Sequence, residues 1–247
     1  MEITNTRKQV IALISLYSER YVLSMVYLYY AINNFITLRD ILSGRMLAEN
    51  TLFIDATHAL ILLLLAIFSF LLLLLSRRPA VPAQKLKFIL VPLAAAFFNY
   101  CYFAEKHFPD SWTHTLAPPV LQMPLLSAGL VCIVIGPAFA FWAMLHLGRS
   151  FGLYVAVRTV VMSGPYKWVR HPMYLGWILL NIGQVLANFS GFYFLLFVIN
   201  VSIITYRASL EQGQLAAHRP EYREYMKHTP FMFPKLPNPF SRPSKAK

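Results

Sequence analysis

Residues 52–75 read LFIDATHALILLLLAIFSFLLLLL, an almost uninterrupted apolar stretch. A helix needs about 20 predominantly apolar residues to cross the hydrocarbon core of a bilayer, and this stretch is long enough. Its apolar residues are continuous, whereas the strands of a membrane barrel alternate apolar and polar residues. The stretch therefore predicts a transmembrane α-helix.

Further apolar stretches lie on both sides of this segment. Of the 247 residues, 57% are hydrophobic and 13% are charged, whereas a soluble domain carries about 25% charged residues. We therefore expect an all-α, polytopic transmembrane protein with a short cytoplasmic cap. Residues 1–247 would form a single membrane domain, ending in a flexible tail at 236–247. About six spans are predicted, at residues 21–37, 52–75, 88–104, 119–147, 172–187 and 192–206.

The chain is basic, with a formal net charge of +12. Its lysines and arginines lie in short segments between the apolar stretches, as in the loop that holds Arg77, Arg78, Lys85 and Lys87. Basic loops mark the cytoplasmic side and attract anionic lipids, so we expect membrane lipids as partners and no nucleic acid. Alternation from this loop places both termini in the cytoplasm. The two cysteines have no metal-ligand spacing, and no metal site is expected.

A polar segment runs directly into the fifth apolar stretch. Residues 163–176 read SGPYKWVRHPMYLG, which places Arg170 and His171 at the boundary of a membrane helix. Ionisable side chains at such a boundary are costly unless they have a partner or a function. Pro172 suits the first position of a helix, which leaves His171 at or near the N-cap. The free N–H groups that follow favour an anion such as a carboxylate or a phosphate.

The last two apolar stretches are separated by residues 188–191, Asn-Phe-Ser-Gly, which predicts a helical hairpin. A hairpin returns the chain to the side on which it started, so the segments 164–176 and 207–225 should meet. One cytoplasmic pocket could then collect charged and aromatic side chains from both. These are Arg170, His171 and Tyr174 from the first segment, and Arg207, Glu211, Tyr222 and Tyr225 from the second. Such a set suits a zwitterionic cofactor with a positive centre, because aromatic faces attract a cation such as a sulfonium.

The segment Ser163-Gly164-Pro165-Tyr166-Lys167-Trp168-Val169-Arg170-His171-Pro172-Met173-Tyr174-Leu175-Gly176-Trp177 resembles the signature of the isoprenylcysteine carboxyl methyltransferase family. The phospholipid methyltransferases carry a similar signature. Residues 147–151, LGRSF, and the blocks EQGQL at 211–215 and PEYREY at 220–225 also resemble the isoprenylcysteine family. The resemblance covers about the last hundred residues, and it departs from the family where Gln212 replaces a second acid and Arg219-Pro220 replaces Phe-Gly.

This resemblance implies an integral membrane methyltransferase with S-adenosylmethionine as its cofactor. Residues 148–235 would form the cofactor-binding region, and residues 1–147 the N-terminal transmembrane helices. Arg170 and Glu211 would be catalytic, with Arg170 orienting a carboxylate or phosphate of the acceptor. The substrate would be a lipid or a prenylated small molecule or protein. The residues implied to bind the cofactor are Gly164, Pro165, Tyr166, His171, Tyr174, Leu175, Gly176, Glu211 and Tyr222.

Three alternatives to an isoprenylcysteine-type carboxyl methyltransferase stay open. A phospholipid N-methyltransferase of the phosphatidylethanolamine type would need a base, because an amine must lose its proton before it can accept a methyl group. An NADPH-dependent membrane reductase of the sterol type resembles the same Arg-His-Pro-x-Tyr region, but the sequence has no added basic cluster for the 2′-phosphate. A non-enzymatic binding or transport protein would spread its polar residues along the spans, whereas here they gather at one edge.

Overall fold

The computed structural model describes residues 2–44, 52–98, 101 and 108–234. Within these ranges every extended regular element is a helix, and an isolated antiparallel bridge pairs Val81 with Val157. The expected all-α fold is therefore confirmed. The predicted tail at 236–247 and part of the predicted third span lie outside the described residues.

The N-terminal helical segment is longer than the sequence predicts. Helix α1 (Glu2–Tyr17) continues through one turn of π-helix, η1 (Ser18–Val22), into α2 (Leu23–Leu42). The predicted span at 21–37 covers only the second half of this segment. The polar side chains in the first half are accommodated by contacts with distant segments: Glu19 is 6% exposed and Ser15 is 3% exposed.

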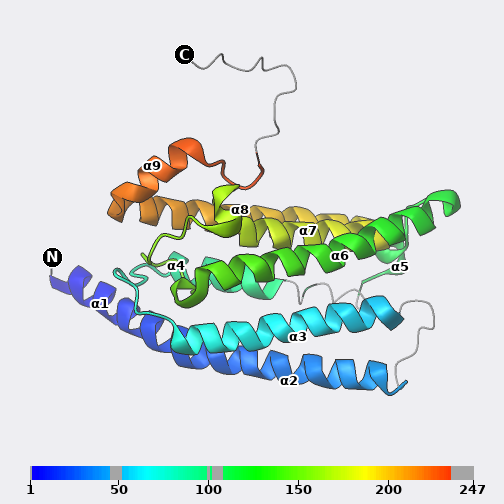
Figure 1. Ribbon diagram of the computed structural model, residues 1–247, viewed down its shortest axis with the longest axis horizontal. Coiled ribbons are helices and arrows are strands. Elements are labelled where there is room, and N and C mark those ends of the chain that lie inside the picture. Colours follow the sequence, from blue (N-terminus) through cyan, green and yellow to red (C-terminus); the bar gives the residue numbers. More distant parts are fainter. Residues whose placement is uncertain (1, 45–51, 99–100, 102–107, 235–247) are drawn as a thin grey trace, which may run out of the picture.

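The long helices lie side by side in the long direction of the molecule (Figure 1). Helix α2 packs along α3 (Leu52–Leu75), and α6 (Pro119–Leu147) packs along α7 (Pro172–Asn188) and also contacts α3. Helix α4 (Lys87–Phe97) packs on α8 (Gly191–His218), and the short α5 (Asp110–Thr113) lies near the opposite end of α8. The apolar core between these helices is built mainly from leucine and aromatic side chains.

Three helical segments in the described part of the chain are long and apolar enough to cross a membrane: Thr6–Leu42, Pro119–Ser150 and Gly191–His218. Two shorter apolar helices are Ala59–Leu75 and Lys87–Phe97. A polytopic helical architecture is therefore confirmed. The expected number of six membrane crossings stays a prediction.

Helices α6 and α7 approach each other closely at glycines. A Cβ atom on Gly136 would lie 2.6 Å from the carbonyl oxygen of Gly176, and a Cβ on Gly129 would lie 2.7 Å from that of Gly183. Small residues let two helix backbones come together in a membrane, where dispersion contacts replace the hydrophobic effect as the main attraction. This contact fixes the position of the α7 N-terminus, which carries the Arg-His-Pro motif.

The hairpin of α7 and α8 is as the sequence predicts, but α8 is longer than expected. It continues from the apolar stretch to His218, so Arg207 and Glu211 belong to the same helix as the span rather than to a separate tail. The side chains of Asn181 and Asn200 hydrogen-bond to each other at 2.8 Å between the two helices. Arg207 and Glu211 are one turn apart on α8 and form an ion pair, which stabilises the helix where the sequence becomes charged.

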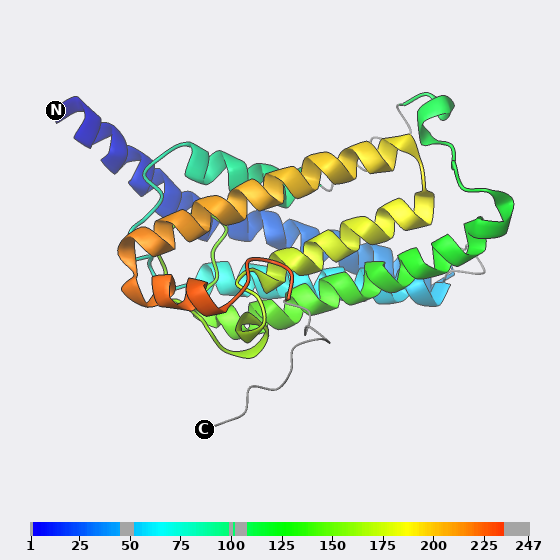
Figure 2. The same ribbon diagram turned by 90° about the horizontal axis from the view of Figure 1, so that it is seen from above.

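The C-terminal part of the described chain folds back over the hairpin. Helix α9 (Pro220–His228) follows α8 after a bend at Arg219, and the irregular segment after α9 returns to the start of α7 (Figure 2). There the backbone N–H of Arg170 donates to Pro230 O at 2.9 Å, and that of His171 donates to Phe231 O at 3.2 Å. The Arg-His-Pro motif is thus covered by a segment some sixty positions later in the chain.

Candidate functional site

A cavity lies where the α7 N-terminus, the last turns of α8 and helix α9 meet. Its lining residues all lie between Leu147 and Tyr225 in the chain. Six of the residues implied by the sequence line it: Tyr166, Arg170, His171, Tyr174, Glu211 and Tyr222. The hairpin therefore brings the two halves of the expected pocket together.

Four further expected residues lie outside the cavity lining. Gly164 has a φ of +58°, and a Cβ atom there would lie 2.2 Å from the imidazole of His146. Pro165 begins the 3₁₀ turn η4 (Gly164–Lys167), whose last residues lead into the motif. Leu175 donates its backbone N–H to His171 O at 3.1 Å, and Gly176 contacts α6. These four residues shape the backbone around the cavity.

Glu211 is the centre of a buried polar cluster. The hydroxyl of Tyr174 donates to Glu211 Oε1, and Arg207 Nε donates to the same oxygen at 3.2 Å. Arg207 also donates from Nη2 to Leu153 O at 2.8 Å, and its guanidinium lies 5.0 Å from the centre of the Tyr174 ring. Glu211 Oε2 accepts no hydrogen bond from the described residues, and the side chain remains 24% exposed. One carboxylate oxygen is therefore fixed by the protein, and the other can meet a ligand.

His171 holds the N-cap position of α7, as expected, but its side chain makes no capping hydrogen bond. Its ring stacks on Tyr174, with centroids 5.5 Å apart, and meets the edge of Phe231 at 5.0 Å. Burial, helped by the positive charges of Arg170 and Arg207, lowers the pKa of His171 to about 3. The imidazole is therefore neutral at pH 7.

Four buried polar atoms of cavity residues have no hydrogen-bond partner in the described part of the chain. They are Arg158 Nε, Arg170 Nε, His171 Nε2 and the hydroxyl of Tyr222. Burial raises the pKa of Tyr222 to about 12, so this hydroxyl keeps its proton. Buried polar groups in folded proteins are nearly always paired, and unpaired ones point to a missing ligand or water. A polar, zwitterionic group such as S-adenosylmethionine fits these donors, the open carboxylate oxygen and the aromatic faces.

Tyr225 has a structural partner, in contrast to Tyr222. Its hydroxyl donates to Tyr166 O at 2.5 Å and so joins α9 to η4. Arg170 lies over the Phe231 ring, with its guanidinium carbon 5.7 Å from the ring centre. The aromatic side chains of α9 and of the returning segment thus close one side of the cavity.

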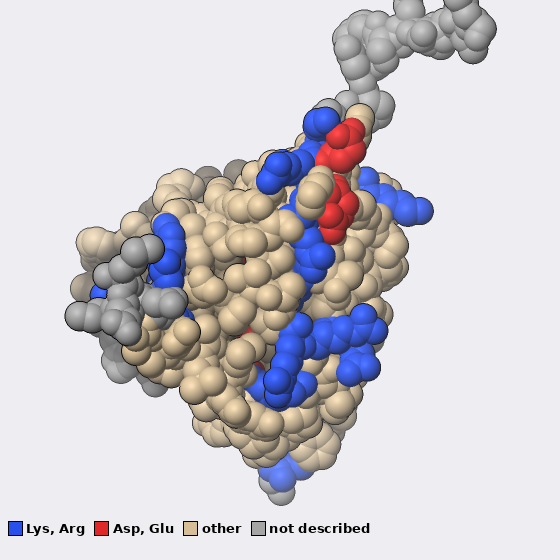
Figure 3. Space-filling view, turned by 90° about the vertical axis from the view of Figure 1, so that its left-hand side faces the viewer, with Lys and Arg blue, Asp and Glu red and all other residues tan. Residues whose placement is uncertain are grey.

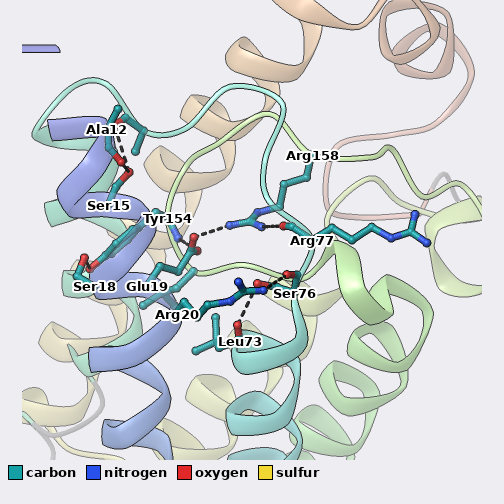
Figure 4. A network of polar contacts seen from close by, with 12 residues as sticks. Ala12, Ser15, Ser18, Glu19, Arg20, Leu73, Ser76, Arg77, Tyr154 and Arg158 are labelled. Carbon is teal, nitrogen blue, oxygen red and sulfur yellow. Dashed lines mark hydrogen bonds and ion pairs between the residues drawn. The ribbon is translucent and has the colours of Figure 1, made fainter. Parts of the chain in front are cut away.

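The opposite wall is the loop between α6 and η4, and sequence reasoning missed its contribution. Tyr154 and Arg158 line the cavity from this loop. Glu19 on η1 accepts the backbone N–H of Tyr154 at 2.8 Å and pairs with Arg158 Nη2 at 2.5 Å (Figure 4). Charged residues at positions 19 and 20, inside an otherwise apolar helical stretch, were the signal that could have revealed this partner.

Residues 129–217 match the model of the isoprenylcysteine carboxyl methyltransferase (ICMT) family. The resemblance seen in the sequence is therefore confirmed over this segment, which runs from the middle of α6 to the end of α8. It contains Arg170, His171, Tyr174 and Glu211, and thus the polar cluster and most of the cavity lining.

Several curated relatives match parts of this chain. Protein-S-isoprenylcysteine O-methyltransferase of Xenopus laevis is 39% identical over 79 residues, which are 29% of this chain and 27% of that protein. The Mus musculus protein of the same name is 39% identical over 72 residues, 27% of this chain and 25% of its own length. The matched segment thus spans about a quarter of each of these relatives. The cobalt-zinc-cadmium resistance protein CzcN of Cupriavidus metallidurans is 29% identical over 130 residues, 51% of this chain and 54% of its own.

A solved structure of the eukaryotic intramembrane Ras methyltransferase ICMT aligns with 94% of this chain and 94% of its own. The sequence identity in this alignment is 16%, and the TM-score is 0.45.

Proposed function

We propose that this chain is an integral membrane, S-adenosylmethionine-dependent methyltransferase that acts on a lipid or lipidated acceptor, most specifically on an isoprenylcysteine-type carboxylate. The observation that carries the proposal is the cavity around Glu211 and His171, with its unpaired polar atoms, inside the segment that matches the ICMT family. The names of the isoprenylcysteine O-methyltransferases that match part of this chain support the same reaction.

When bound, S-adenosylmethionine supplies a methyl group that its sulfonium makes reactive. Glu211 would attract the positive amine or a ribose hydroxyl through Oε2, while Tyr174 and Arg207 hold Oε1. The aromatic ring of Tyr174 would face the positive sulfur. His171 Nε2 and the Tyr222 hydroxyl would bind polar groups of the same ligand. The protein's main contributions are alignment of donor and acceptor and exclusion of water.

Arg170 would orient the acceptor. Its Nε is buried and unpaired within the described part of the chain, and a guanidinium can bind both oxygens of a carboxylate. A carboxylate acceptor needs no proton removed, whereas an amine does. The neutral His171, with its pKa of about 3, is too weak a base to deprotonate an ammonium group efficiently. This favours carboxyl O-methylation over the phospholipid N-methyltransferase alternative.

Isothermal titration calorimetry tests the cofactor. Purified full-length protein in nanodiscs should bind S-adenosylmethionine, and NADPH should not displace it. NADPH has to be tested as well, because arginines from separate segments lie together beside the cavity. The sequence alone did not reveal this cluster. Tight NADPH binding without S-adenosylmethionine binding would establish the reductase alternative instead, and binding of neither would leave a non-enzymatic role.

Transfer of a tritiated methyl group tests the acceptor. We expect label in a farnesylated cysteine analogue with a free carboxylate, and none in the same analogue as its methyl ester. Label in phosphatidylethanolamine would identify an N-methyltransferase. The cavity, and with it both termini, would face the cytoplasm, which a reporter fused to the C-terminus can test by its accessibility in intact cells.

A further inference from the structure

A second cavity, next to the first, is lined mainly by arginines. Four separate segments contribute them: the chain after α3, the 3₁₀ turn η3 (Gly148–Ser150), the loop behind it, and the bend between α8 and α9. We name this cavity the arginine pocket. Its charged lining residues are Arg77, Arg78, Arg149, Arg158 and Arg219, and Ala80, Ser150 and Thr159 complete it. Figure 3 shows lysine and arginine side chains gathered across this end of the molecule.

The acidic residues near the arginine pocket do not balance its positive charge. Arg158 pairs with Glu19 at 2.5 Å, and Arg219 lies 3.9 Å from Glu221, which is half exposed. The other three arginines form no ion pair with the described residues. Five positive charges thus converge where two carboxylates lie, and repulsion between like charges at short distance opposes folding. A bound anion would offset this repulsion.

Two guanidinium groups of the arginine pocket carry donors that the protein leaves unused. Arg158 Nε and Arg219 Nε are buried and have no hydrogen-bond partner in the described part of the chain. The Arg158 side chain is 10% exposed, and it is held in place because Nη2 binds Glu19 and Nη1 donates to Arg77 O at 3.2 Å. Arg149 is fixed in a similar way, since its Nε donates to Leu75 O at 3.0 Å. The donors are therefore positioned before any ligand arrives.

Basic residues at one end of a membrane protein are explained in general by the positive-inside rule. That rule concerns the number of charges in a loop and does not account for convergence of separated segments on one cavity, or for buried unpaired donors within it. Guanidinium groups that surround a cavity match the several oxygens of a phosphate, and the hydroxyls of Ser150 and Thr159 add neutral donors. The arginine pocket also lies just beyond the ends of α3 and α6, where lipid headgroups are expected.

From these contacts we infer that the arginine pocket binds a phosphate group, carried by the headgroup of an anionic lipid or by a soluble ion. Ser150, Arg158 and Thr159 line both this pocket and the candidate cofactor cavity, so the phosphate would lie beside the cofactor without replacing it. The inference does not depend on methyl transfer, and its test is binding alone.

Calorimetric titration of full-length protein in detergent with dioctanoyl phosphatidic acid tests the inference. The double variant Arg78→Gln/Arg219→Gln should weaken binding by at least about tenfold, because it removes two of the five positive charges that line the pocket. Arg223→Gln removes one positive charge from the neighbouring α9, outside the pocket, and should leave the affinity unchanged. Dioctanoyl phosphatidylcholine, whose headgroup has no net charge, should bind much more weakly.

Titration with inorganic phosphate separates the two sources of the ligand. Competition at similar concentrations would identify a soluble ion as sufficient, and competition only at far higher concentrations would identify the lipid. Either result supports the site. The inference would be overturned if the double variant and the unaltered protein bound equally well, or if neither ligand bound. It would also be overturned if S-adenosylmethionine displaced phosphatidic acid one to one, because the anion would then occupy the cofactor cavity.

Discussion

Arg158 Nη2 lies 2.5 Å from Glu19 Oε2, and this pair joins the N-terminal helical segment to the loop that forms one wall of the candidate cofactor cavity. Both side chains are almost completely buried, at 10% and 8% exposure. Glu19 also accepts the backbone N–H of Tyr154 from the same loop. The N-terminal helical segment, which lies outside the ICMT-like segment, thus holds a wall of the site in place (Figure 4).

Glu19→Gln should therefore destabilise the protein and weaken cofactor binding together. The change leaves the Arg158 guanidinium buried without a counter-charge, a loss that costs about 3–5 kcal/mol in buried pairs. We expect a clear decrease in Tm in detergent. Glu221→Gln is the matched control, because Glu221 is 51% exposed and lies 3.9 Å from its arginine. An unchanged Tm for Glu19→Gln would show that the pair does not hold the loop.

Glu211→Ala should weaken S-adenosylmethionine binding by about ten- to a hundredfold, because it removes a charged partner of the ligand, for which ~1.5–3 kcal/mol is typical. Glu211→Gln should have an intermediate effect, since its amide oxygen can still accept from Tyr174. Calorimetry measures both. Glu224→Ala on the exposed face of α9, where Glu224 pairs with Lys227, should change nothing. Normal binding by Glu211→Ala would remove Glu211 from the site.

Removal of the Tyr225 hydroxyl and removal of the Tyr222 hydroxyl should have different effects on Tm. Tyr225→Phe breaks a hydrogen bond to Tyr166 O and leaves that carbonyl unpaired, at a cost of about 1–3 kcal/mol, so Tm should fall. Tyr222 has no hydroxyl partner in the described structure, so Tyr222→Phe should keep or raise Tm and weaken ligand binding. Thermal unfolding with and without S-adenosylmethionine separates the two effects. The reverse pattern would exchange the roles of the two tyrosines.

The sequence predicts the motif at the start of α7 better than the course of α8. The motif around Arg170 and the hairpin are local patterns, and a four-residue turn between two apolar stretches dictates that their ends meet. Pro172 and His171 therefore take the positions that were expected. The continuation of α8 through Glu211 was missed, because a change from apolar to charged residues marks the end of a membrane span but not the end of the helix that contains it.

The partners of the loop between α6 and η4 could not be predicted, because they come from sequence-distant segments. Glu19 and Arg158 are 139 positions apart, and no local pattern connects them. The arginine pocket is assembled in the same way, from four segments that look like separate basic loops. Gly176 was assigned to the cofactor from a motif, whereas its surroundings in the fold are the backbone of α6.

Burial of neutral His171 should make stability depend on pH. The folded pKa of about 3 lies below the ordinary value of 6.5, so the unfolded chain binds the proton more readily between these values. The contribution of His171 to stability should therefore be constant above pH 6.5 and should fall as the pH decreases from 6.5 toward 3, by up to about 1.4 kcal/mol per pH unit. Tm measured from pH 7.5 to 5 for His171→Asn should decrease less steeply than for the unaltered protein. His228→Gln, at an exposed position, should keep the original slope.

Gly176→Ala should lower Tm even though Ala is the better helix former. The new Cβ would lie 2.6 Å from Gly136 O and 2.8 Å from Ala140 N, and backbone atoms cannot move away as a flexible side chain can. Overpacking of this kind costs about 1–3 kcal/mol and would push α6 away from the α7 N-terminus. Gly213→Ala is the matched control on α8, since nothing lies within 4 Å of its added Cβ, and it should stabilise the protein by roughly 0.5–1 kcal/mol. If Gly176→Ala instead lowered cofactor affinity and left Tm unchanged, Gly176 would contact the cofactor directly, because the helix packing would then be intact.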